Sequence, residues 1–169
     1  MGIKESDPAS NGQERSTDTQ ASASASAVIG VTAGEERYLI PMTEVSEVIV
    51  MPKLADVPLT QPWFLGLANV RGNLYGITDL GVYLGHKPVP FNLKSRVLLI
   101  SPGDKLCGGF AVHSMLGIRK LSEFTPGKSP RKKLPAGIQA HYQDAEGRIW
   151  KVLSLYTLIR DDKFLQIAR

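Results

Sequence analysis

The chain has 169 residues, enough for one domain or for two small subdomains that share a core. Apolar residues make up 43% and charged residues 21%, which excludes a fibrous, collagen-like or wholly disordered protein. The net charge of +4 is too small to indicate nucleic-acid or membrane binding by itself. The single cysteine, Cys107, excludes an internal disulfide and a multi-cysteine zinc site, and its apolar neighbours predict a buried side chain.

The first 26 residues predict a disordered tail. Past Met1 and Ile3 they hold no large apolar side chain, and they end in alternating Ala and Ser, so they cannot bury enough surface to offset the entropy of ordering. Two basic and four acidic residues give the tail a charge of −2 and leave +6 on residues 27–169, which we expect to form the folded domain. We see neither a secretory signal nor an apolar run that would span a bilayer, which favours a cytoplasmic protein.

The folded part is predicted to be mainly β, because Pro and Gly divide its apolar pattern into short pieces. We expect strands at 27–32 and 37–40, joined by a turn. Pro41 is able to begin a helix, and the helical spacing of Val45, Val48 and Ile49 predicts one or two helical turns before extended chain from position 50.

The middle of the chain predicts a hairpin followed by a short helix. Strands at 66–71 and 74–78 flank Gly72-Asn73, and glycine accepts the positive φ of a tight connection. Asp79 is expected to cap a helix that runs through Leu84 and stops at Gly85.

The second half predicts more short strands, and a helix near the C-terminus. Strands are expected at 96–101, 106–112, 137–142 and 148–154, with 115–124 ambiguous between helix and strand. Leu155, Leu158 and Ile159 suggest the helix, which Asp161-Asp162 either breaks or caps for a continuation. The strands fall into two blocks separated by the loop 86–93, which points to small barrels or a sandwich and away from a doubly wound fold.

No pattern for catalysis or metal binding stands out. The sequence has no phosphate-binding loop, no G-x-S-x-G and no H-E-x-x-H. Three histidines are far apart in sequence and are interpreted as surface or packing residues: His86, His113 and His141. Two carboxylate pairs are interpreted as solvated helix faces or caps: Glu44/Glu47 and Asp161/Asp162. We therefore expect no enzymatic activity, no cofactor and no metal.

The basic loop 128–133 keeps an alternative open, a small β-barrel that binds nucleic acid through its phosphates. Against it, the aromatic residues are not interleaved with basic ones, as a stacking surface would require. Four aromatic residues lie inside apolar runs and are expected in the core: Trp63, Tyr75, Phe110 and Trp150.

The segment 66–80 holds the most conspicuous polar residue, Arg71, at the corner of the predicted hairpin. Its guanidinium presents a fixed fork of donors to whatever docks there. Spacing alone nevertheless favours an exposed turn residue without a partner.

Two ordered motifs resemble the CheW-like domain, the adaptor of bacterial chemosensory arrays, and the resemblance runs from about Ala27 to the end. Residues 34–49 match a "Y-x-I-P/D-x-x-x-V-x-E-V/I" segment. A "G-x-x-N-x-R-G-x-x-x-x-I/V-x-D-L" segment is met at these positions: Gly66, Asn69, Arg71, Gly72 and Thr78-Asp79-Leu80. His113 replaces the aspartate of the family's "V-D-x-V" element, and this departure, the basic loop and the ending at 156–167 are more similar to the CheW-like proteins of type IV pilus (twitching) systems than to the flagellar adaptor.

The resemblance implies two five-stranded SH3-like barrels around a shared core, and a non-catalytic adaptor without cofactor. It implies two partners, the cytoplasmic tip of a methyl-accepting chemoreceptor and the regulatory domain of a CheA-type histidine kinase, at receptor arrays of the inner membrane. A groove for the receptor's helical tip would include six residues: Val45, Glu47, Gly66, Asn69, Arg71 and Gly72. Val45 and Glu47 are expected on the first helical turn, and no contact residues for the kinase follow.

Overall fold

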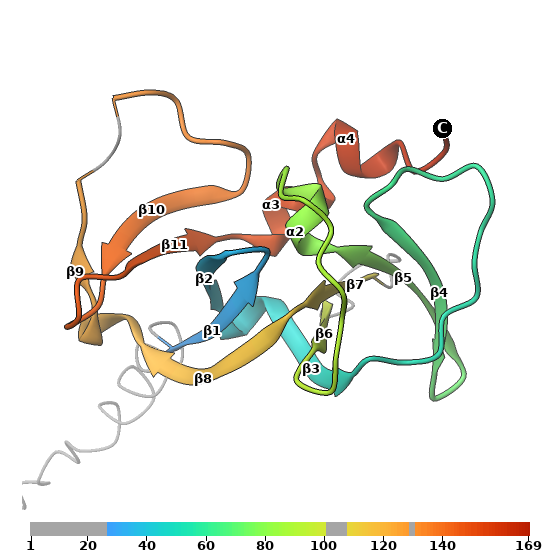
Figure 1. Cartoon of the computed structure of the whole chain (residues 1–169), viewed down its shortest axis with the longest axis horizontal. Helices are drawn as coiled ribbons and strands as arrows, with labels where there is room; N and C mark the ends of the chain where they lie inside the picture. Colours follow the sequence, from blue (N-terminus) through green and yellow to red (C-terminus); the bar gives the residue numbers. More distant parts are fainter. Residues whose placement is uncertain (1–26, 101–107, 129–130) are drawn as a thin grey trace, which may run out of the picture.

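The computed structural model describes residues 27–100, 108–128 and 131–169, and shows two curled β-sheets side by side (Figure 1). The predicted tail, Cys107 and the connection at 102–105 lie outside the described residues. Within the described part, none of the helices has both the length and the apolar character needed to cross a membrane.

The six-stranded sheet combines strands from both ends of the domain, in the order β8-β1-β2-β11-β10-β9. Its strands are β1 (Ala27–Ala33), β2 (Glu36–Pro41), β8 (Ser114–Lys120), β9 (Thr125–Pro126), β10 (Ile138–Gln143) and β11 (Ile149–Leu153). Neighbouring strands are antiparallel except β2 and β11, which pair in parallel. The strands predicted at 27–32, 37–40, 137–142 and 148–154 are confirmed, and the last two pair with each other.

The five-stranded sheet is formed by the stretch between β2 and β8, in the order β3-β6-β7-β5-β4. Its strands are β3 (Val45–Val50), β4 (Phe64–Val70), β5 (Asn73–Asp79), β6 (Arg96–Ile100) and β7 (Gly108–Val112). The loop 86–93 joins two parts of this sheet, so the prediction that it separates the two blocks was wrong. The segment that forms the five-stranded sheet is therefore inserted in the sequence between β2 and β8 of the six-stranded sheet.

The strands β1, β2, β6 and β7 are buried on both faces, which explains their nearly continuous apolar runs. In β6, Leu98 and Ile100 face a central core between the sheets, while Val97 and Leu99 face a second cluster inside the curl of the five-stranded sheet. A third cluster fills the curl of the six-stranded sheet and includes Trp150. The two subdomains therefore share a central apolar core, as expected for SH3-like subdomains.

The predicted helix at Val45 is wrong. Only a 3-10 turn, η1 (Met42–Glu44), precedes the strand β3, which pairs with β6. A β-bulge between Val45 and Glu47 shifts the alternation, so that Val45 and Val48 both pack on the central core while Ile49 faces the other cluster. The bulge explains why apolar residues at 45, 48 and 49, a spacing typical of a helix, occur in a strand.

The short helices near the predicted caps are confirmed. Asp79 accepts a hydrogen bond from Val82 N at the start of α2 (Leu80–Tyr83), and Gly85 follows with a φ of 95°. The C-terminal helix is α3 (Leu155–Ile159), capped by Ser154. Asp161 caps the continuation, α4 (Asp162–Leu165). The ambiguous segment 115–124 forms most of β8 and the 3-10 turn η2 (Leu121–Glu123).

Candidate functional site

The corner between β4 and β5 is a two-residue turn made by Arg71 and Gly72, one position earlier than predicted. Val70 pairs with Asn73, and the two central residues have φ values of 52° and 83°. Two positive φ values define the type I′ turn, whose twist matches that of the flanking strands. The Asn69 side chain accepts a hydrogen bond from Gly72 N at 2.9 Å, which fixes the turn.

Arg71 has a partner, contrary to the expectation from spacing alone. Its Nη1 donates to Glu47 Oε2 at 2.8 Å, and its Nη2 donates to Glu47 Oε1. The pair raises the pKa of Arg71. Arg71 remains 74% exposed at its side chain, so the ion pair lies at the surface.

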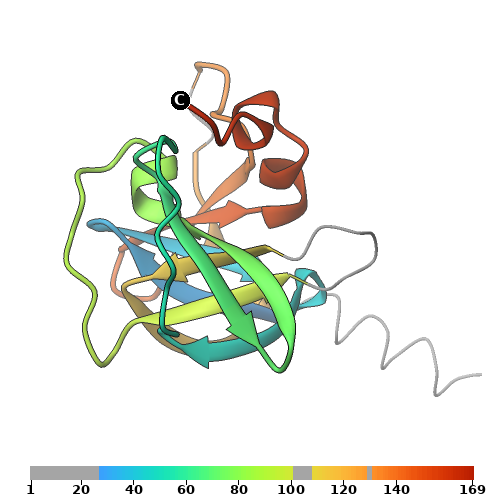
Figure 2. The ribbon, with the colours of Figure 1, turned by 90° about the vertical axis from the view of Figure 1, so that its right-hand side faces the viewer.

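This ion pair joins the two edges of the five-stranded sheet. Arg71 follows the edge strand β4, and Glu47 lies in the opposite edge strand β3. Their contact requires the sheet to curl, and Figure 2 shows the β4–β5 hairpin (green) sweeping across the other strands. Two residues that are 24 positions apart thereby form one surface.

Gly66 supports this surface from beneath. It is buried, with a φ of 133°, and a Cβ placed on it would lie 2.4 Å from the carbonyl oxygen of Ala55. Ala55 and Leu67 exchange two backbone hydrogen bonds, of 2.8 and 2.9 Å, which bind the β3–β4 connection to β4. Only glycine leaves room for this close approach.

The six expected receptor contacts therefore come together around β3 and the hairpin, in different roles. Glu47, Asn69, Arg71 and Gly72 lie at the hairpin corner, and Gly66 acts through its backbone. Val45 is half-buried on β3, where it packs against the central core.

Sequence reasoning missed two exposed apolar residues on these strands. Leu74 is 59% exposed and pairs across the hairpin with Asn69, while Val50 at the end of β3 is 65% exposed. Strand alternation was the available signal for Leu74. Tyr75 and Ile77 face the core, so Leu74, one position before Tyr75, faces the opposite side of the strand. The pairing of Leu74 with Asn69 depends on a turn at Arg71-Gly72, and the sequence predicted that turn one residue later.

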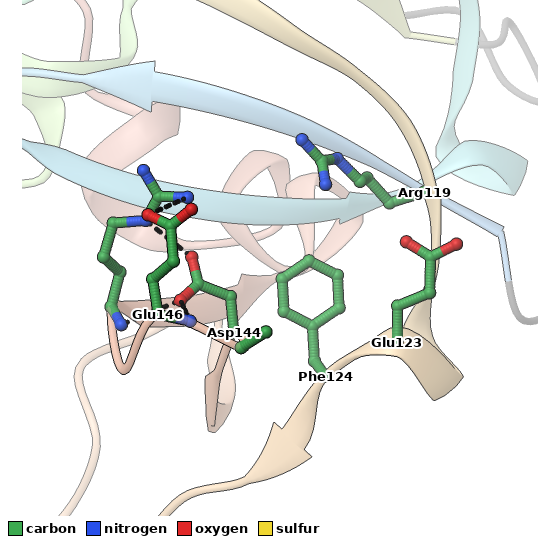
Figure 3. Close-up of a pocket in the computed structure, with 7 residues that line it drawn as sticks. Arg119, Glu123, Phe124, Asp144 and Glu146 are labelled. Carbon is green, nitrogen blue, oxygen red and sulfur yellow. Dashed lines mark hydrogen bonds and ion pairs between the residues drawn. The ribbon is translucent and has the colours of Figure 1, made fainter.

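A hollow on the other sheet is lined by mixed charges around Phe124 (Figure 3). Asp144 Oδ2 accepts hydrogen bonds from Trp150 Nε1 at 3.0 Å and from Arg148 Nε at 2.7 Å. The Trp150 donor, the guanidinium of Arg148 and backbone N–H groups together hold the pKa of Asp144 well below its usual range. This network closes the β10–β11 turn, because Asp144 Oδ1 also accepts hydrogen bonds from Glu146 N and Arg148 N, both at 2.9 Å.

The predicted solvated pair Glu44/Glu47 is wrong. Glu44 is 6% exposed and accepts hydrogen bonds from Ser154 Oγ at 3.0 Å and Tyr156 N at 3.1 Å. It therefore ties the link between the two sheets to the start of α3, while Glu47 pairs with Arg71 instead.

Two of the three histidines are packing residues. His113 Nδ1 accepts from Gly34 N at 3.1 Å, so its Nε2 carries the proton and donates to Val89 O at 3.0 Å. His86 Nε2 lies 2.8 Å from the hydroxyl of Tyr38. Within the described part of the chain, no three metal-binding side chains gather in one place.

The features behind the nucleic-acid alternative do not form one surface. The four aromatic residues predicted as core are buried: Trp63, Tyr75, Phe110 and Trp150. The described residues of the basic loop are exposed: Lys128, Arg131, Lys132 and Lys133. The cations therefore lie in solvent without these rings beside them for bases to stack on.

Comparison with known proteins agrees with the motifs and the fold. The CheW-like domain family matches residues 27–163. The chain is 31% identical over 144 residues to Protein PilI of Pseudomonas aeruginosa, which covers 83% of this chain and 79% of that protein. It is 32% identical over 82 residues to Chemotaxis protein CheW of Helicobacter pylori, covering 48% of this chain and 50% of that protein. The scaffolding protein TtCheW from Thermoanaerobacter tengcongensis has a similar fold, with a TM-score of 0.67 and 17% identity over 82% of this chain and 94% of that one. The chain belongs to the CheW-like domain family.

Proposed function

We propose that this protein is a non-catalytic adaptor that couples a methyl-accepting chemoreceptor to a CheA-type histidine kinase. The family match over residues 27–163 carries the proposal. The similarity to PilI over most of both chains supports a pathway that controls type IV pilus twitching motility. The adaptor domain would comprise residues 27–169, follow a tail of residues 1–26, and work in the cytoplasm at arrays on the inner membrane.

The receptor would bind across β3 and the β4–β5 hairpin. Leu74 and Val50 supply exposed apolar area, and the Arg71–Glu47 pair supplies charge beside it. A helical receptor tip that lays apolar side chains on such a surface is a familiar mode of peptide recognition. Val45, Gly66, Asn69 and Gly72 would shape this surface from within the two strands and the turn.

Arg71 keeps the capacity to orient a partner although it is already paired. A guanidinium has five N–H donors, and Glu47 accepts two hydrogen bonds from Arg71. Three donors are left for carboxylate or carbonyl oxygens of the receptor. Glu47 holds the side chain in one direction, which lowers the entropy that binding would otherwise cost.

A titration of the intact protein with the cognate receptor's cytoplasmic tip tests this proposal. We expect the wild type to bind and Arg71→Glu to bind weakly, because the reversed charge repels Glu47 and removes the donors. Arg131→Glu is the matched control, since Arg131 is an exposed arginine on the other sheet's loop. The adaptor proposal fails if folded wild-type protein binds neither the receptor tip nor the kinase regulatory domain. If both variants bind the receptor tip equally well, the role given to Arg71 is wrong.

A further inference from the structure

The segment after the family match is joined to the loop that leads into β4. The match ends at residue 163, yet Phe164–Arg169 continues along the connection between β3 and β4. Figure 1 shows the C-terminus beside this connection, which is drawn in teal. We call residues 164–169 the C-terminal strap.

Backbone hydrogen bonds make the first part of the contact. Thr60 and Ala168 form an antiparallel bridge. Gln61 N donates to Ile167 O at 2.8 Å, and Arg169 N donates to Leu59 O at 2.9 Å. The strap therefore pairs through one isolated bridge with a loop that lies outside the named strands of both sheets.

Aromatic packing makes the second part. The ring of Phe164 stacks on Trp63, with centroids 5.9 Å apart and planes 15° apart, and it also contacts Tyr83 and Phe110. Trp63 directly precedes β4, and its carbonyl accepts a hydrogen bond from Asp79 N at 2.7 Å. Phe164 thus holds the residue from which β4 starts.

The loop needs such support because it contains a strained residue. Leu59 has a φ of 58°, a left-handed conformation that costs a non-glycine residue free energy, and its side chain is 80% exposed. No burial of Leu59 compensates for that cost. Its carbonyl is held by Arg169 N, and Thr60 Oγ1 donates to Val57 O at 3.0 Å in the same turn. Strained conformations persist where the surroundings over-determine them.

The same loop presses on Gly66, whose place in the receptor surface rests on the proposed function. Ala55, four residues before Leu59, makes the backbone pair with Leu67 and approaches Gly66 too closely for any side chain. The strap lies at the end of β4 away from Arg71, so its effect on the hairpin runs through Ala55 (Figure 1). We propose that the C-terminal strap is a positioning element, which holds the β3–β4 connection against β4 and so fixes the strand that carries the receptor-facing hairpin.

Amide hydrogen exchange on the full chain tests this inference without a partner. Arg169→Pro removes the N–H that donates to Leu59 O. Ala168→Pro is the matched control, because no acceptor for Ala168 N occurs among the described residues. We expect Arg169→Pro to speed exchange at the Ala55 and Leu67 amides about fivefold, the equivalent of one net hydrogen bond, and Ala168→Pro to leave them unchanged.

Two outcomes separate the strap from the receptor site. Faster exchange at the Gln61 amide alone would overturn the inference, because the strap would then protect only its own contact. Binding of the receptor tip is measured in parallel, and Arg169→Pro should weaken it about threefold, which is less than the loss of one net hydrogen bond would give. If exchange changes as expected but the wild type does not bind the tip, the strap stands and the receptor site is wrong.

Discussion

Arg71 combines a strained backbone conformation with an exposed side chain. A type I′ turn favours Asn, Asp or Gly at its first central position, and arginine there adopts a φ of 52° at a cost. The exposed ion pair with Glu47 contributes little to stability, because water and salt screen charges at the surface. Asparagine or glycine would meet the requirement of this turn with less strain, so an arginine here fits the binding role proposed for it.

Arg71→Asn should separate stability from binding. Asparagine accepts the left-handed conformation, so the free energy of unfolding should stay within ~1 kcal/mol of wild type. Affinity for the receptor tip should fall about tenfold or more, because charge-assisted hydrogen bonds are lost. Urea unfolding and a binding titration on the same sample measure both. A variant that loses stability but keeps affinity would show that Arg71 is structural.

Asp144 should make stability depend on acid. Its pKa is lowered in the folded protein by Trp150, Arg148 and backbone N–H groups, so its stabilisation is complete above the unfolded-state pKa of about 4. The stabilisation is lost as pH falls from there through the folded-state pKa. In thermal melts followed by circular dichroism, Asp144→Asn should therefore have a lower Tm than the wild type at pH 7. The difference in Tm should become smaller as the pH is lowered to 2.

Glu146→Gln is the control for that series. Glu146 is exposed and makes its ion pair with Arg148 at the surface, so its removal should change the Tm little. A gap between wild type and Asp144→Asn that stays constant from pH 7 to pH 2 would contradict the role given to the Asp144 network.

Among the elements, those with local signals could be predicted and those shaped by pairing could not. Asp79 and Gly85 mark the ends of α2 through capping, which depends on neighbours in sequence. The strand β3 was misread because its bulge, set by pairing with β6, imitates helical spacing. The hairpin was placed one residue late because Arg71 takes a conformation that sequence reasoning assigns to glycine.

Gly66→Ala should damage β4 more than its conformation alone explains. The new Cβ would meet the Ala55 carbonyl, and overpacking of this kind costs ~1–3 kcal/mol beyond the backbone strain. Gly147→Ala is the control, since Gly147 also has a positive φ but no atom within 4 Å of an added Cβ. Equal losses of stability in urea for the two variants would contradict the close contact with Ala55.

For the whole molecule, the motifs identified the right family, but the order of strands along the chain did not predict which strands share a sheet. The parallel pairs β2–β11 and β5–β7 join distant segments, and neither follows from local pattern. In β1, β2, β6 and β7, alternate side chains pack into two different apolar clusters. Most positions in these strands are therefore apolar or small, and the apolar runs are nearly uninterrupted. Glu44 was wrongly predicted to be solvated because its hydrogen-bond partners, Ser154 and Tyr156, lie more than 100 positions away in the sequence.

The adaptor role is tested most directly by asking whether the protein holds both partners at once. The receptor's cytoplasmic tip and the kinase regulatory domain are mixed with the full chain, and complexes are measured by light scattering after size-exclusion chromatography. We predict one complex that contains all three components and loses the receptor, but not the kinase, with Arg71→Glu. Partners that displace each other, or a kinase that binds only when the receptor is absent, would contradict a coupling function.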